Sequence, residues 1–349
     1  MTKERQQNTR LARSAFAAVI LLLSPIPSIA KESTKAKQVT ESAEAQAAVL
    51  WSSPTEIASR DLFYGPGGKE HEPHTRFTFL GEDLNGTNPK FDVRDENGVK
   101  WRVKLGPEVR PEIAASRLLW AVGYSANEDY FLSDLRVEHM QRLKRGQKLV
   151  GLNGLIHDVR LKRYVKDDRK VGEWKWQQNP FTGTREFNGL RVMMALLNNW
   201  DLKDQNNSID EQRSGNDHDR VLQYLVSDLG ASFGTTGISF PIKDSKGNLR
   251  AYAHSKFIQK VNGQHVDFNV PSMPSLLRLV NIKGFVARLH LRWIGRNIPR
   301  ADARWMGELL SQLSAQQIRD AFRAAGYSPE QVEQFTEVVR KRTAELQQL

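Results

Sequence analysis

The sequence predicts an α+β fold in which a sheet-rich first half precedes a mainly helical second half. Apolar and polar residues alternate between Arg76 and Leu105, as in strands buried on one face. Beyond Gly183 the apolar residues recur at helical spacing instead. The chain has 349 residues, of which 39% are hydrophobic and 26% are charged, an ordinary globular composition. We therefore expect one large domain or two lobes with a sizeable core.

The first half is predicted to follow the order β-β-β-α-β-β. Asn97 and Gly98 separate two alternating runs and tolerate positive φ, which predicts a hairpin turn and antiparallel strands. Pro111 is expected to be the first residue of a helix, where its missing N–H costs nothing, and Gly123 ends the helical pattern. Strand-like runs follow near Tyr130–Val137 and Leu155–Val165.

The second half is predicted to be helical around a polar loop region that begins beyond Gly237. Ser314 and Gln317 have the spacing of a capping box, and Gly326 suits the position just after a helix. The expected helices cover 187–197, 274–296, 301–312, 314–325 and 329–346.

The N-terminus has the pattern of a secretory signal peptide over residues 1–30. A basic region precedes an apolar run at 11–23, and Ser28-Ile29-Ala30 offers small residues for cleavage. Residues 31–50 are polar and predict a flexible linker. We expect an exported mature chain, periplasmic or secreted, without a further membrane span; the alternative is an uncleaved anchor. The basic side chains of this N-terminal region are Lys3, Arg5, Arg10 and Arg13.

The composition excludes several classes of protein and disfavours one class of partner. There is no Cys, so disulfides, thiolate zinc sites, Cys nucleophiles and a lipoprotein anchor are excluded. Loss of residues 1–30 removes a net charge of +3 from the total of +11, which leaves about +8. This charge is spread along the chain, and we interpret its densest patch as a solvated face rather than a nucleic-acid site. The patch comprises Arg142, Lys144, Arg145 and Lys148.

Two short motifs carry the candidate chemistry. The first, Asp201-Leu202-Lys203-Asp204-Gln205-Asn206, directly follows an amphipathic helix. The second, Asp228-Leu229-Gly230, follows the apolar run 221–226. An acid with Lys at +2 and Asn at +5 is the pattern of a protein-kinase catalytic loop, and D-[FL]-G is its metal-binding counterpart. Carboxylate and amide oxygens are the hard ligands that Mg²⁺ prefers.

With these motifs the chain resembles the kinase superfamily, as an atypical member similar to lipid-kinase, HipA-like and secretory-pathway kinases. The resemblance covers about residues 76–235 and implies a bilobal fold, with an antiparallel-sheet lobe at 51–165 and a helical lobe at 166–349. It implies ATP, or another nucleotide, and Mg²⁺ as cofactors. Asp201 would be the catalytic base and Lys203 the phosphate-contacting lysine. The implied metal ligands are Asn206 and Asp228.

The same resemblance assigns nucleotide-binding residues in the first half. Trp101-Arg102-Val103-Lys104-Leu105 is similar to the strand that carries the ATP-anchoring lysine, which makes Lys104 the candidate and Glu112 its ion-pair partner. The segment from Gly81 to Gly86 stands where kinases cover the phosphates. The chain departs from the family pattern in having Asn199-Trp200 before Asp201, and in a polar insert at 210–220.

Other interpretations of the sequence stay open. The implied function is phosphate transfer to a protein, lipid or glycan hydroxyl, and the alternative is a non-catalytic pseudokinase that binds a ligand or the envelope. A third option is an unrelated secreted α+β domain. Among weaker patterns, His71 and His74 suggest a metal site, and His157-Asp158 suggests half of a hydrolytic dyad. Trp174 and Trp176 are interpreted as packing residues.

Overall fold

The structure is a computed structural model that describes residues 47–165, 168–213, 220–236, 244–271, 282, 286 and 289–349. All of them belong to one compact unit, Ala45–Leu349. The predicted signal peptide at 1–30 and most of the linker lie outside the described residues. The last residues of that predicted linker differ from expectation, because 47–49 form a strand and Leu50 is buried.

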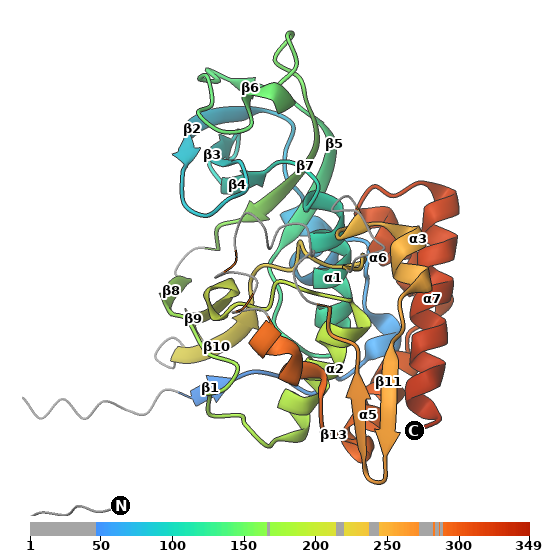
Figure 1. Cartoon of the computed structure of the whole chain (residues 1–349). Helices are drawn as coiled ribbons and strands as arrows, with labels where there is room; N and C mark the ends of the chain where they lie inside the picture. Colours follow the sequence, from blue (N-terminus) through green and yellow to red (C-terminus); the bar gives the residue numbers. More distant parts are fainter. Residues whose placement is uncertain are drawn as a thin grey trace, which may run out of the picture. The chain divides into compact units, whose positions relative to one another are not determined.

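A six-stranded sheet forms the upper part of Figure 1 and contains the three predicted antiparallel strands. Its strand order is β5-β7-β4-β3-β2-β6, antiparallel except for the short β2–β6 pair. The predicted element order along the chain, β-β-β-α-β-β, is confirmed apart from the additional short strand β6, and so is the turn at Asn97 and Gly98. The strands are β2 (Phe77–Asp83), β3 (Lys90–Asp95), β4 (Lys100–Lys104), β5 (Asp129–Leu135), β6 (Val137–Glu138) and β7 (Ile156–Arg163).

The two faces of this sheet differ in chemistry because side chains alternate along each strand. On β4, Trp101 and Val103 are buried in an apolar core with residues of the neighbouring strands. Arg102 and Lys104 point to the opposite face. Two further basic residues on β7 are paired in register with them. Arg160 lies opposite Lys104, and Lys162 lies opposite Arg102. The sheet thus has one apolar face and one charged face, and Lys104 lies on the charged face.

Helix α1 (Val109–Ala121) connects the sheet to the rest of the chain. It begins before Pro111, not at it as predicted, because the turn at Gly106 and Pro107 already enters helical geometry at Val109. Almost all of its side chains are buried, and it contacts both strand β7 and helix α6. Gly123 follows with a φ of +99°, which favours glycine and stops the helix. Helix α1 therefore begins beside Lys104 and then runs through the core of the helical part.

The second half is mainly helical, as predicted (Figure 1). Thr184 caps α2 through a bond from the Phe187 amide, and the predicted capping box of Ser314 and Gln317 is present. Gly326 has the expected positive φ. The α-helices are α2 (Arg185–Leu196), α3 (Leu249–His254), α5 (Arg300–Ser311), α6 (Ala315–Ala324) and α7 (Pro329–Gln347). Short 3₁₀ helices cover Ile57–Ser59, Gly65–Gly67, Lys69–His71, Gln147–Leu149, Asp204–Asn206 and Leu291–Gly295.

Two smaller sheets were not predicted. In one, the order is β1-β10-β9-β8, and the predicted polar insert partly forms its β9–β10 hairpin. In the other, β11, β12 and β13 occupy a region predicted as loop. The predicted helix at 274–296 falls largely outside the described residues. The strands are β1 (Ala47–Val49), β8 (Arg169–Gly172), β9 (Asn207–Arg213), β10 (Arg220–Val226), β11 (Ile258–Asn262), β12 (His265–Phe268) and β13 (Ile298–Pro299).

The predicted fold class is confirmed: the chain is α+β, with an antiparallel sheet and one helix followed by a mainly helical part. The boundary between lobes near residue 165 stays a prediction. Within the part of the chain that the structure describes, no helix is both long and apolar enough to span a bilayer.

Candidate functional site

Lys104 lies at the centre of a buried cluster of carboxylates. Its Nζ is 2.8 Å from Oε2 of Glu112 and 3.2 Å from Oδ1 of Asp228. Lys104 ends strand β4, Glu112 lies in the first turn of α1, and Asp228 follows β10, so three separate elements meet here. Only 5% of Lys104 and 2% of Glu112 are exposed. The predicted ion pair between Lys104 and Glu112 is therefore present, with Asp228 beside it.

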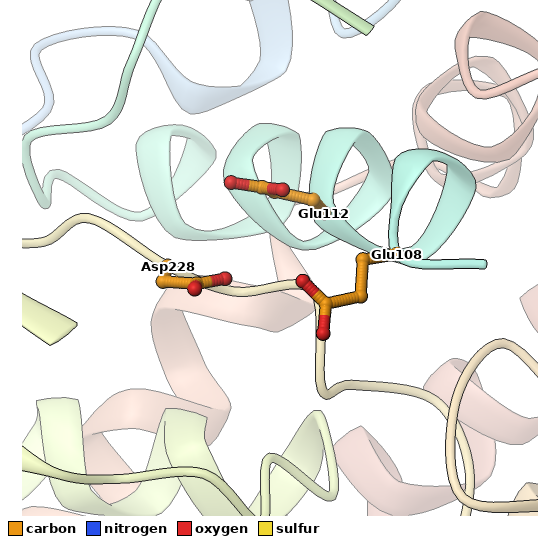
Figure 2. Close-up of side chains that lie close together, drawn as sticks. All are labelled: Glu108, Glu112 and Asp228. Carbon is orange, nitrogen blue, oxygen red and sulfur yellow. The ribbon is translucent and has the colours of Figure 1, made fainter. Parts of the chain in front are cut away.

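Glu108 is a member of this cluster that the sequence analysis missed. Its Oε2 lies 2.8 Å from Lys104 Nζ, and its other oxygen pairs with Lys246. Figure 2 shows Glu108 immediately before α1, with Glu112 on the helix and Asp228 on the facing chain segment. A Cβ on Gly230 would come within 2.5 Å of the Cβ of Glu108, so glycine after Asp228 lets this segment approach α1. An acid four residues after the lysine was the signal available in the sequence.

The pKa values of the residues in this cluster depend on one another. Burial alone would lower the pKa of Lys104, but the three surrounding carboxylates outweigh it and raise that pKa well above its ordinary value. Burial raises the pKa of Glu112 to about 7, although the Arg160 and Lys104 cations oppose that rise. Burial also opposes ionisation of Asp228, yet Lys104 holds its pKa below the usual range. Lys104, together with Arg160 and Lys246, thus supplies the positive charge that allows the carboxylates to lie side by side.

Arg160 on β7 supports the cluster from the sheet. Its Nη1 lies 2.7 Å from Oε1 of Glu112 and 3.3 Å from Oδ1 of Asp129. The other oxygen of Asp129 accepts a hydrogen bond from Ser116 at 3.2 Å. All of these groups are buried. Arg160 and Lys104 consequently hold Glu112 from both of its oxygens, which fixes the side chain toward the sheet.

The two sequence motifs lie side by side through their backbones. The carbonyl oxygen of Asn206 accepts hydrogen bonds from the amides of Ser227 and Asp228, at 2.8 and 3.3 Å. The Ser227 hydroxyl donates to the same carbonyl at 3.0 Å. Twenty-odd residues separate these segments along the chain, so the fold itself brings the Asp201 loop to Asp228.

Within the first motif the side chains order their own loop. Asn206 donates through Nδ2 to the carbonyl oxygen of Asp201 at 2.5 Å, and Lys203 Nζ lies 3.2 Å from Oδ2 of Asp201. Asn199 accepts from the Asp201 amide at 3.0 Å. Asp201 keeps about a fifth of its side-chain surface exposed. It is therefore a partly accessible carboxylate in a fixed loop beside the buried cluster.

The predicted glycine loop differs from expectation. Gly81 lies within strand β2 at a β-bulge, because pairing with β3 continues to Asp83. Gly86, with a φ of +70°, does lie in the connection between the strands, and its carbonyl oxygen accepts from Arg145. Asn88 in the same connection donates to Glu108. The contact between this hairpin and the cluster is thus made by Asn88 and not by either glycine.

The weaker sequence patterns are not brought together as sites. His71 contacts Glu128 at 3.0 Å, whereas His74 contacts Asn97, so the two imidazoles have different partners. His157 pairs with Asp134 and the adjacent Asp158 pairs with Arg110. Trp174 and Trp176 are buried and pack edge to face with 4.8 Å between ring centroids, as predicted for packing residues.

The cluster contains oxygen donors of the kind that a hard divalent cation uses, although each of its three carboxylates also contacts Lys104. One oxygen each of Glu108, Glu112 and Asp228 lie within 4.8 Å of one another. The backbone carbonyl of Asn206 lies beside Asp228, whereas the Asn206 side chain donates to the carbonyl oxygen of Asp201. Oxygen donors from carboxylates and amides are those that Mg²⁺ takes in proteins, usually through one or two carboxylates plus phosphate oxygens.

A cavity of about 560 Å³ lies where the end of β7 meets strands β8, β9 and β10, and none of Lys104, Glu108, Glu112 and Asp228 lines it. Its walls include Lys162 of β7, Asp168 before β8, Asp210 of β9 and Leu225 of β10. Burial raises the pKa of Asp168 to about 6. Charged and polar side chains therefore make up a large part of this wall.

The raised pKa of Asp168 predicts that its ionisation opposes folding. The folded chain holds this proton more tightly than the unfolded chain between about pH 4 and pH 6, so stability falls as pH rises through that window. Asp168→Asn should remove this loss and stabilise the protein at pH 7 by less than about 1 kcal/mol, because Asp168 is half exposed and screened. Urea unfolding at both ends of the window measures the difference. The exposed Glu173→Gln serves as control, and a destabilised Asp168→Asn at pH 7 would contradict the prediction.

The element order and the meeting of Lys104, Glu112 and Asp228 agree with the kinase-like arrangement that the sequence motifs led us to expect. No family model and no curated protein matches the chain. Solved structures with a similar arrangement include the proinflammatory kinase CtkA of Helicobacter pylori, at 12% identity over 78% of this chain and 99% of that one, with a TM-score of 0.34. The Golgi casein kinase matches at 12% identity over 82% of this chain and 77% of its own, with a TM-score of 0.30. Its form with Mn/ADP bound matches at 12% identity over 78% and 75%, with a TM-score of 0.28.

Proposed function

We propose that this chain is a phosphotransferase that uses ATP and Mg²⁺ to modify a hydroxyl group of a protein, lipid or glycan. The observation that carries the proposal is the buried ion pair of Lys104 with Glu112, placed against Asp228. This arrangement combines a phosphate-binding cation with a metal-binding carboxylate. Among kinases we place the chain nearest to the divergent lipid-kinase, HipA-like and secretory-pathway groups. Export of the mature chain, to the periplasm or the medium, is part of the proposal and rests on residues 1–30.

Each residue has a chemical task in this proposal. Asp201 accepts the proton of the acceptor hydroxyl, whose oxygen bonds to the γ-phosphorus as the bond to the leaving nucleotide oxygen breaks. Lys203 and Lys104 balance the charge of the phosphate oxygens. Mg²⁺, when bound by Asn206 and Asp228, would supply further charge neutralisation between the phosphates.

The proposal is tested by nucleotide binding and its dependence on Asp228. Calorimetric titration of the wild type with ATP should show binding that strengthens on addition of Mg²⁺. Asp228→Asn should remove most of that Mg²⁺-dependent gain, because it deletes a metal-binding charge. Asp267→Asn is the matched control, since Asp267 accepts a bond from the Asn297 amide far from the cluster. A wild type that binds no nucleotide with or without Mg²⁺ refutes the proposed function.

One observation favours a non-catalytic, pseudokinase-type binding protein as a second candidate. An ammonium group has three donors, and Lys104 Nζ already faces Glu108, Glu112 and Asp228. Phosphate binding by Lys104 then requires one of these carboxylates to move. Tight Mg-nucleotide binding without any transfer of ³²P from labelled ATP to water or acceptor hydroxyls would support this candidate over the enzyme.

A further inference from the structure

The connection between strands β6 and β7 is a basic loop that has no part in the proposed function. It covers residues 139–155, and its sequence contains no Asp or Glu. Figure 1 shows this connection, in green, at the top of the six-stranded sheet. The four cations of the basic patch all lie on it, which gives the loop a net charge of +4: Arg142, Lys144, Arg145 and Lys148.

The first part of this loop is anchored on the sheet. Leu143 is buried in the apolar core of the sheet. Arg145 donates to the carbonyl oxygens of Asp83, at 3.2 Å, and of Gly86, both in the β2–β3 hairpin. The loop backbone is fixed as well, because the amides of Lys144 and Arg145 donate to Glu82 at 2.7 and 2.8 Å. Of the four cations, Arg145 therefore serves to hold the loop in place.

The second part of the loop is a tight turn that presents Leu152 to solvent. The amide of Gly151 donates to the carbonyl oxygen of Leu155 at 2.8 Å. Arg136, just before β6, donates to the carbonyl oxygen of Asn153 at 3.1 Å. The relative exposure of Leu152 is 112%, so its side chain is fully open to water. The hydrogen bonds of the turn thus keep an apolar side chain outside the protein.

Unpaired cations and a second exposed leucine accompany Leu152. Leu149 is 38% exposed. Arg142, Lys144 and Lys148 are exposed, and none of them forms an ion pair with a carboxylate of the described residues. Single exposed leucines are common on soluble proteins. Two exposed leucines and three unpaired cations within residues 142–152 are instead the combination found on surfaces that bind anionic bilayers.

We propose that the loop 139–155 binds the surface of a membrane that contains anionic phospholipid. The two leucines enter the boundary between head groups and acyl chains, and the three unpaired cations contact the lipid phosphates. Each Lys or Arg near such a surface strengthens binding by about fivefold. Removal of a leucine side chain from water contributes at least about tenfold. This inference goes beyond the proposed function and does not depend on it, because no residue of the loop belongs to the Lys104 cluster.

The leucines favour a bilayer over other anionic partners. A nucleic acid would contact the cations through its phosphates but would offer Leu152 no apolar surface to enter. An acidic protein would need a pocket that matches the protruding turn, whereas a bilayer accepts an apolar side chain without a complementary shape. Because hydrogen bonds already fix the turn, little conformational freedom is lost when it binds.

The test measures cosedimentation of the chain from Lys31 onward with lipid vesicles. This form retains the compact unit Ala45–Leu349 and omits the apolar run at 11–23, which is expected to enter a bilayer on its own. Vesicles of phosphatidylcholine with about 30% phosphatidylglycerol should bind the wild type at least about tenfold more tightly than vesicles of phosphatidylcholine alone. Lys144→Gln/Lys148→Gln should weaken that binding by about 25-fold, at about fivefold for each cation. Leu152→Gln should weaken it by at least about tenfold.

Two control variants lie outside the loop. Arg340→Gln/Lys341→Gln removes two exposed cations from helix α7, and Val261→Gln removes an apolar side chain that is 46% exposed on β11. Neither control should change vesicle binding. A wild type that binds neither kind of vesicle overturns the inference, and so do controls that weaken binding as much as the loop variants.

The apolar and the charged contributions are separated by the single variant. If Leu152→Gln bound anionic vesicles as tightly as the wild type, the cations alone would attract any polyanion, and the inference would be wrong. Thermal unfolding of each variant identifies loss of fold. If Lys144→Gln/Lys148→Gln does not fold, Leu152→Gln decides the result, because the Leu152 side chain is fully exposed.

Discussion

Lys104→Met should destabilise the folded chain by about 3–5 kcal/mol, the cost of leaving buried charge without its partner. The substitution keeps the length of the side chain but removes the ammonium that faces Glu108, Glu112 and Asp228. Arg160 would still pair with Glu112 and Lys246 with Glu108, so the uncompensated charge falls mainly on Asp228. Urea unfolding of wild type and variant measures the loss.

A double variant shows whether electrostatics causes the loss. In Lys104→Met/Asp228→Asn the carboxylate that loses its ion-pair partner is neutralised together with the ammonium, so part of the lost stability should return. Lys148→Met is the matched control, because Lys148 is exposed and forms no ion pair within the described part of the chain. Full stability of Lys104→Met alone would show that the cluster does not carry the charges assigned to it.

Much of the six-stranded sheet could be predicted because apolar and polar residues alternate along its strands, which indicates that one face is buried. Val103 and Lys104 fall on opposite faces of β4, and a period of two residues fixes that relation without knowledge of the partner strands. Strand β1 could not be predicted in this way. Its sequence Ala47-Ala48-Val49 has no alternation, and it is a strand only because β10 lies parallel beside it. Such pairing depends on tertiary contacts and leaves no local pattern.

The part of the candidate site that lies within one short segment of the chain could be predicted from the spacing of its residues. Asp201, Lys203 and Asn206 lie within one loop, so their proximity follows from the chain itself. Glu108 was missed because its approach to Lys104 requires the chain to reverse through Gly106, which has a φ of +94°. The position of Lys162 in the cavity wall likewise depends on strand register, which could not be predicted from the sequence.

Asp201→Ala should reduce phosphate transfer by about 10²–10⁴-fold, the usual contribution of a general base, while Mg-nucleotide binding stays within about twofold. The two effects separate because Asp201 acts on the acceptor hydroxyl, whereas Lys104 and Asp228 bind phosphate and metal in the proposed arrangement. The ion pair with Lys203 is partly exposed, so its loss should change the unfolding free energy by under about 1 kcal/mol. Transfer rates with saturating ATP and a thermal unfolding curve give both quantities.

The control for this variant lies in the same loop. Asp204→Asn keeps an oxygen that can accept from the Trp176 amide, as Asp204 does at 3.1 Å, and should leave transfer unchanged. If Asp201→Ala weakened nucleotide binding as much as transfer, Asp201 would be a binding residue and the base would have to be sought elsewhere. If transfer continued at the wild-type rate, Asp201 would have no part in the reaction. The contacts of Asn206 and Lys203 with Asp201 would then serve only to fold the loop.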